Sequence, residues 1–169
     1  VLHVQQAWKP IVLPPFILKF PWHTEDVVQK ALVGFDSSAD FVELKLQGGI
    51  AFGTGEHPTT QLCLEWIGHV LSSKDTPIRR VMDYGAGSGV LGMAACKLDP
   101  TVTAIGVDID VDAVQIANAN VKENNVAMTN YLSNLLQTRD DESRSVLLKN
   151  QGSSKQKDMM IQTLPEEWN

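Results

Sequence analysis

Blocks of apolar residues between positions 59 and 126 predict strands and helices in alternation. Two short apolar runs each end in an aspartate and predict strands, whereas longer segments with apolar residues on one face predict helices. Strands that alternate with helices of this length indicate an α/β fold, a parallel sheet with flanking helices and right-handed crossovers. The expected elements are a helix capped by Thr59 or Thr60, a strand ending at Asp83, a helix at 90–98, a strand at 103–108 and a helix begun by Asp112.

Proline and aromatic residues are concentrated in the first 58 residues, most densely between Trp8 and Trp22. Proline excludes a helix over that stretch and restricts strands to the edges of a sheet. We therefore expect extended chain or an edge hairpin packed on the α/β part, followed by a second extended run at 41–46. Residues 1–58 are assigned to a linker with extended segments, whose aromatic side chains serve mainly to pack.

The segment from Ala127 to Asn169 breaks the alternating pattern. It is rich in polar and turn-forming residues, and only 145–148 and 159–161 form apolar runs. Too little apolar surface is available there to offset the conformational entropy of the chain. We therefore expect an α/β half domain at 59–126 and a poorly ordered tail at 127–169.

A glycine-rich loop follows the strand that ends at Asp83. Glycine at every second position, Gly85, Gly87 and Gly89, lets the backbone adopt positive φ values and approach a ligand closely. The carboxylate of Asp83 would repel the phosphates of a dinucleotide, but it would attract S-adenosylmethionine (AdoMet), which carries a sulfonium and an ammonium group. The loop therefore predicts an AdoMet site. Residues 87–92 also fit the dinucleotide pattern G-x-G-x-x-G, and a bare strand-to-helix turn is a third interpretation.

The second strand supplies an independent acid, because its apolar run ends at Asp108. A carboxylate at the tip of this strand can accept hydrogen bonds from two vicinal ribose hydroxyls. The alternative role for Asp108 is a helix N-cap, but Asp110 and Asp112 stand closer to the following helix and could fill it. We therefore assign Asp108 to the ribose, with Asp110 as the second candidate.

Composition and charge narrow the classes of partner. The chain has 169 residues, 43% of them hydrophobic, which suits about one globular domain, and its net charge is −6. That charge argues against direct nucleic acid binding, which needs clustered Lys and Arg, and suits a lysine-rich protein substrate better. The two cysteines and four histidines lack metal-ligand spacing, and no C-x-x-C is present. No apolar run approaches the about 18 residues of a membrane span. We therefore expect no metal, no membrane contact and an intracellular protein.

A second motif lies before the first helix of the α/β part. Residues 51–60 have the sequence AFGTGEHPTT, residues 83–91 DYGAGSGVL and residues 106–110 GVDID. Together these segments resemble the ribosomal protein L11 methyltransferase family (PrmA-like), in which A-F-G-T-G-x-H-x-T-T precedes the helix that leads to D-x-G-x-G-S-G-V-L. The likeness covers residues 8–126, and its two main motifs fall in the right order.

The resemblance implies a Rossmann-like class I methyltransferase that transfers methyl groups from AdoMet to lysine and N-terminal amines of a ribosomal protein. It implies that Thr60 contacts the cofactor near the helix start, that Gly85 holds the loop and that Asp108 binds the ribose. Such a protein would belong in the cytoplasm or in the matrix of a chloroplast or mitochondrion. No general base can be assigned. His57 is the one histidine near the expected site, and a structural role in its loop competes with a role as base.

Two parts of the family pattern have no counterpart in the expected elements. One is an N-terminal substrate-recognition domain, and the other is a set of later strands with an Asn-containing motif, for which Asn130 and Asn134 are unconvincing substitutes. We therefore expect an incomplete fold. Three hypotheses follow: an active protein-lysine methyltransferase, a truncated AdoMet-binding module without turnover, and an NAD-dependent oxidoreductase fragment. Asp83 and the 51–60 motif argue against the third, and the oligomeric state is not predicted.

Overall fold

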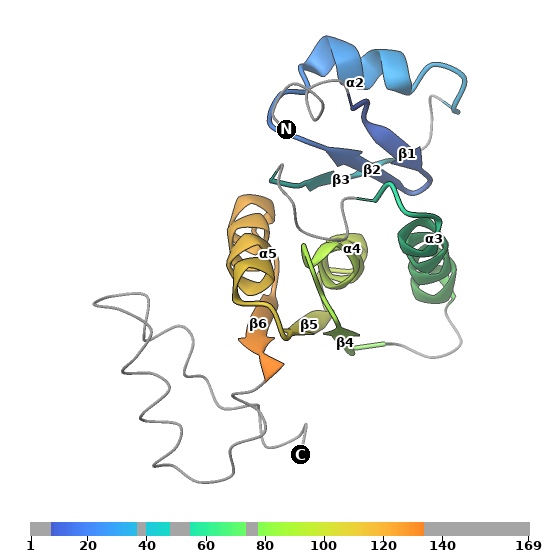
Figure 1. The fold of residues 1–169 in the computed structure, drawn as a ribbon. Coiled ribbons are helices and arrows are strands. Elements are labelled where there is room, and N and C mark those ends of the chain that lie inside the picture. The colour runs from blue at the N-terminus through green and yellow to red at the C-terminus, as the bar shows by residue number, and fades with distance from the viewer. Residues whose placement is uncertain (1–7, 37–39, 48–54, 74–77, 134–169) are drawn as a thin grey trace, which may run out of the picture.

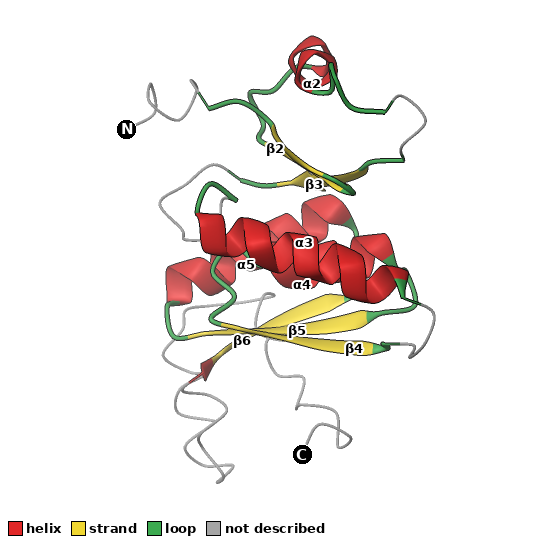
Figure 2. Ribbon diagram, turned by 90° about the vertical axis from the view of Figure 1, so that its right-hand side faces the viewer, coloured by secondary structure: helices red, strands yellow, loops and turns green. Residues whose placement is uncertain are grey.

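The computed structural model describes residues 8–36, 40–47, 55–73 and 78–133, and these residues stack in layers. A short helix lies outside a small N-terminal sheet, three helices form the next layer, and a second sheet lies beneath them (Figures 1 and 2). The elements in chain order are β1 (Ile11–Leu13), β2 (Phe16–Lys19), α2 (Glu25–Ala31), β3 (Val42–Lys45), α3 (Pro58–Ser72), β4 (Arg80–Tyr84), α4 (Val90–Leu98), β5 (Thr103–Asp108), α5 (Val111–Asn124) and β6 (Met128–Leu132).

The second sheet confirms the predicted α/β fold. Its strands are parallel and lie in the order β4-β5-β6, with Asp83 opposite Gly106 and Gly106 opposite Asn130. Figure 2 shows α3, α4 and α5 together on one face of this sheet. Because all three strands point the same way, the residues that follow β4 and β5 meet at one edge of the sheet. That edge holds the glycine loop.

Strand β6 lies in the segment for which we expected poor order, so that expectation is wrong for residues 128–132. Pairing with β5 provides hydrogen-bond partners along one side of the strand, and Met128, Tyr131 and Leu132 are buried, which a composition averaged over the whole tail does not reveal. Residues 134–169 lie outside the described ranges.

The N-terminal sheet contains the expected hairpin and second extended run. Strand β1 pairs antiparallel with β2, and β2 pairs parallel with β3, so β2 is the central strand rather than an edge. This is possible because its residues, Phe16–Lys19, include no proline. Helix α2 was not predicted, although Thr24 at its N-cap, followed by Glu25 and Asp26, is a typical helix start.

The larger of two hydrophobic clusters joins this small sheet to the helices. Phe16, Leu18 and Leu44 from the sheet, and Leu64 and Met93 from α3 and α4, are all inaccessible to solvent and belong to one cluster. Burying a side chain of this size is worth about 1.5–3 kcal/mol. The sheet that precedes α3 is therefore fixed on the helix layer by packing, as expected for the proline-rich and aromatic segment. None of the helices in the described ranges is long and apolar enough to span a membrane.

Candidate functional site

The loop between β4 and α4 has the backbone that its glycines predict. The φ angles of Gly85, Gly87 and Gly89 are 76°, 54° and 77°. Residues that have a Cβ adopt such values only with strain. The backbone N–H groups of Gly85 and Ala86 donate to the carbonyl of Val107, at 2.7 and 3.0 Å. The loop is therefore folded over the end of β5, next to Asp108.

Asp108 is part of this loop site. Its Oδ2 accepts a hydrogen bond from Gly87 N at 2.8 Å, and its Oδ1 accepts one from Asp110 N at 3.0 Å. An ionised carboxylate offers about four lone-pair positions, so two acceptor positions are left for further donors such as hydroxyl groups. The side chain is partly exposed, which leaves it within reach of a ligand.

Asp110 is the helix N-cap, the other role considered for Asp108 and Asp110. Its Oδ1 accepts from Asp112 N at 2.9 Å, and it is the N-cap of α5, which begins at Val111. The expectation that a residue other than Asp108 caps this helix is therefore confirmed. The helix begins one residue earlier than predicted.

Asp83 lies beneath the loop rather than at its open edge. It is 6% exposed, and its Oδ2 accepts a hydrogen bond from Gly92 N, the third residue of α4, at 3.0 Å. Burial raises the pKa of Asp83 from 3.8 to about 6; the Gly92 N–H opposes this rise, and the charge of Asp108 adds to it. Asp83 thus caps the first turn of α4, whose own N-cap, Gly89, has no side chain.

The charges around the loop are acidic. Residues 81–96 and 103–121 contain no lysine or arginine, while Asp83, Asp108 and Asp110 all lie at this edge of the sheet. The start of a helix normally attracts anions, but here Asp83 already occupies the Gly92 N–H. A phosphate bound at the start of α4 would have to compete with that carboxylate, whereas a cation would be attracted.

Helix α3 begins differently from the prediction. His57 is its N-cap, with Nδ1 accepting from Thr59 N at 3.2 Å, and Pro58 takes the first helical position. The expected cap at Thr59 or Thr60 is therefore wrong, because proline favours that first position and moves both threonines into the helix. The structural role considered for His57 is the one observed.

Thr60 is half-buried in the first turn of α3, and within the described residues no hydrogen bond joins its side chain to the glycine loop. Residues 51–54 of its motif lie outside the described ranges.

Asn120 on α5 also contacts the loop, and it was not predicted. Its Nδ2 donates to the carbonyl of Ser88 at 2.9 Å, from a side chain with no solvent exposure. A sequence signal for its burial was present. Asn120 and Asn124 lie one helical turn apart and continue the spacing of Ala113 and Ala117, which are also buried.

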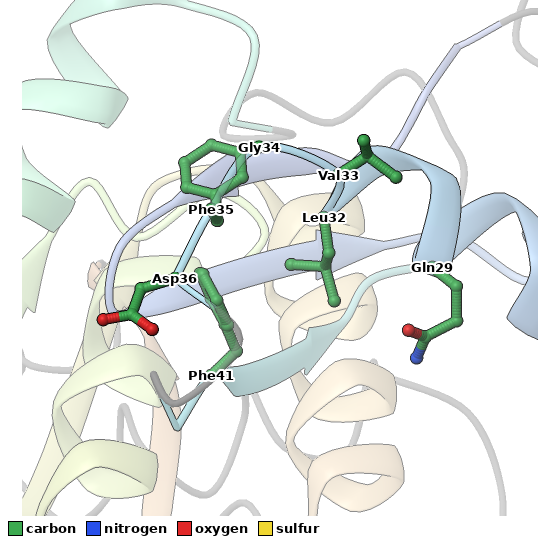
Figure 3. A pocket seen from close by; sticks show the side chains of 7 residues that line it. All are labelled: Gln29, Leu32, Val33, Gly34, Phe35, Asp36 and Phe41. Carbon is green, nitrogen blue, oxygen red and sulfur yellow. The ribbon is translucent and has the colours of Figure 1, made fainter.

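A shallow hollow of about 350 Å³ lies elsewhere, between the end of α2 and the start of β3. Figure 3 shows Leu32, Val33, Phe35 and Phe41 around it, and the rings of Phe35 and Phe41 are in edge-to-face contact with centroids 5.9 Å apart. It belongs to the N-terminal layer and contains none of the predicted site residues. In the described residues no group of three or more His, Cys, Asp or Glu side chains could hold a metal ion.

Comparison with known proteins identifies the family. The model of the family described as Ribosomal protein L11 methyltransferase (PrmA) matches residues 2–151. The chain belongs to the ribosomal protein L11 methyltransferase family. The resemblance seen in the two sequence motifs is thus confirmed.

Individual relatives agree with this assignment. The ribosomal protein L11 methyltransferase of Bordetella bronchiseptica is 42% identical over 133 residues, which cover 78% of this chain and 41% of that protein. That of Chromobacterium violaceum is 45% identical over 93 residues, 55% of this chain and 30% of the relative. The chain therefore matches less than half the length of these two curated relatives.

A solved structure supports the fold. The crystal structure of ribosomal protein L11 methylase from Lactobacillus delbrueckii subsp. bulgaricus superposes with a TM-score of 0.59 at 25% identity. The superposition covers 79% of this chain and 62% of that chain. The three parallel strands and their helices are accordingly part of a Rossmann-like methyltransferase fold.

Proposed function

We propose that the chain binds AdoMet at the loop formed by Gly85, Gly87 and Gly89, as the cofactor-binding part of a methyltransferase that acts on a ribosomal protein. The observation that carries this proposal is the hydrogen bond from Gly92 N to Asp83. It occupies the start of α4 with a carboxylate, which disfavours a dinucleotide phosphate at that place and favours a cationic ligand.

The proposed roles of the individual residues follow from their positions. Asp108 binds the ribose hydroxyls with the acceptor positions that Gly87 N and Asp110 N leave free. Asp83 contributes negative potential from below the loop. Thr60, in the first turn of α3, contacts the carboxylate end of the cofactor, as the family resemblance implies.

The proposed acceptors are lysine and N-terminal amines of the ribosomal protein. AdoMet supplies an activated methyl group, and an unprotonated amine must approach it in line with the carbon–sulfur bond that breaks. Alignment of the two reactants can supply about 7–11 kcal/mol in favourable cases, so the task of the protein is mainly to position them. We also propose an intracellular location, in the cytoplasm or an organelle matrix, which suits the free thiols of Cys63 and Cys96.

Calorimetric titrations of the chain with AdoMet and with NAD test the cofactor assignment. We expect saturable binding of AdoMet and weaker or undetectable binding of NAD. Tighter binding of NAD would show that the loop is a dinucleotide site and would overturn the proposal.

A methyl-transfer assay separates turnover from binding alone. A second candidate function is AdoMet binding without turnover, because the matched segment covers only 41% of the Bordetella relative. The chain and a chimaera extended with the C-terminal part of that relative are incubated with labelled AdoMet and ribosomal protein L11. Label transfer by the chimaera alone supports the binding module, whereas comparable transfer by both proteins shows that the chain is an active enzyme.

A further inference from the structure

Asn120 joins two parts of the structure that are far apart in the sequence. Its Oδ1 accepts from Gln47 N, just after β3, at 2.7 Å, and its Nδ2 donates to the carbonyl of Ser88 at 2.9 Å. The side chain is completely buried. One amide group therefore connects the end of the N-terminal sheet to the glycine loop.

Asn124 makes related contacts one helical turn later. Its Oδ1 accepts from Lys45 N at 2.9 Å, and its Nδ2 donates to Lys45 O at 2.7 Å and to Asn120 O at 2.8 Å. Four residues of helix rise about 6 Å, close to the about 6.6 Å between alternate residues of a strand. The two amides therefore have the same spacing as Lys45, the last residue of β3, and Gln47 just after it. They lie on the side of β3 that β2 does not occupy. Figure 1 shows α5 next to this strand.

The two asparagines differ in their contact with the loop. Asn124 contacts β3, its own helix and, with Nδ2 3.7 Å from Met93 Sδ, helix α4, whereas Asn120 contacts the glycine loop at Ser88. Ser88 stands between Gly87 and Gly89, both at positive φ, where the backbone is permissive and its carbonyl direction depends on anchors outside the loop. Asp108 holds the loop at Gly87 N, and Asn120 holds it at Ser88 O.

We propose that Asn120 is a positioning residue for the cofactor loop, which it fixes at Ser88 O in register with the end of β3. This inference rests on the proposed AdoMet function of that loop. A change at Asn120 should therefore alter both the exchange of the loop amides and the affinity for AdoMet. A change at Asn124 should affect the fold alone.

Asn120→Asp and Asn124→Asp are the paired variants, because each retains an acceptor for a backbone N–H at or just after the end of β3. Asn120→Asp loses the donor to Ser88 O, whereas Asn124→Asp loses the donor to Lys45 O and Asn120 O. Melting temperature, calorimetric AdoMet affinity and hydrogen–deuterium exchange of residues 85–92 without ligand are measured for both variants and the unchanged chain. We expect a lower melting temperature for both variants, with at least as large a loss for Asn124→Asp, which loses two hydrogen bonds to carbonyl groups. We also expect Asn120→Asp alone to raise the AdoMet Kd about three- to tenfold, the range for loss of one hydrogen bond, with faster exchange in residues 85–92.

Equal Kd values and equal exchange of residues 85–92 in the two variants would overturn the proposal and leave Asn120 a purely structural residue. If the buried carboxylates prevent folding, the pair Asn120→Ala and Asn124→Ala serves with the same readouts. If the unchanged chain binds no AdoMet, the proposed function fails, and the exchange measured without ligand still decides whether Asn120 positions the loop.

Discussion

Replacement of Asp83 by asparagine should stabilise the fold while it weakens the binding of AdoMet. The carboxylate is 6% exposed and receives one hydrogen bond, from Gly92 N at 3.0 Å, which an asparagine oxygen can also accept. The substitution removes a buried charge and retains nearly the same shape. The gain in stability should therefore be close to the free energy by which ionised Asp83 opposes folding.

The pKa of Asp83 gives the size and the sign of that effect. Its pKa is 3.8 in the unfolded chain and about 6 in the folded protein, because of burial and the charge of Asp108. Each pKa unit corresponds to about 1.4 kcal/mol, so ionised Asp83 opposes folding by about 3 kcal/mol. Between pH 4 and 6 the folded state keeps Asp83 protonated, whereas the unfolded state has already released the proton. The contribution of Asp83 to stability therefore falls as the pH rises through this range and is constant above it.

Urea denaturation of the chain and of Asp83→Asn at pH 7.5 and pH 4.5 measures this difference. We expect the variant to be more stable by about 3 kcal/mol at pH 7.5 and by about 1 kcal/mol at pH 4.5. Glu65→Gln, which removes an exposed carboxylate from α3, is the control and should change stability by less than about 0.5 kcal/mol at either pH. Equal or lower stability of Asp83→Asn at pH 7.5 would refute the reasoning, because it would mean that the buried charge is fully compensated.

Three further substitutions test the rest of the site. Asp108→Ala should weaken AdoMet binding by about 1.5–3 kcal/mol in calorimetry, the scale of hydrogen bonds to a charged group, and unchanged affinity would contradict the ribose assignment. Gly106→Ala should lower the free energy of unfolding by about 1–3 kcal/mol, because the new Cβ would overlap Asn130 Oδ1 and lie 2.7 Å from Met128 Cε; an unchanged urea midpoint would show that β6 can shift. His57→Ala should lower stability by about 1 kcal/mol through loss of the α3 cap, with recovery in His57→Asn, whereas loss of AdoMet affinity in both variants would indicate a contact with the cofactor.

Much of the α/β part could be predicted from local signals. The apolar runs that end at Asp83 and Asp108 mark β4 and β5, the glycines between them mark the loop, and Asp99 with Pro100 marks the end of α4. Each of these signals acts within about ten residues, through φ preferences, helix periodicity or a missing N–H donor. Such features depend little on the rest of the chain, and the family motifs lie among them.

The sequence by itself therefore determined the order of strands and helices from α3 to α5, and the glycine loop with its two acids. The tertiary structure alone decided that Asp83 is buried beneath the loop, that β6 joins the sheet and that Asn120 links Gln47 to Ser88. These contacts join residues up to 73 positions apart. A polar residue gives no local sign of which distant backbone group it will meet, because its partner is set only when the sheets and helices pack against each other.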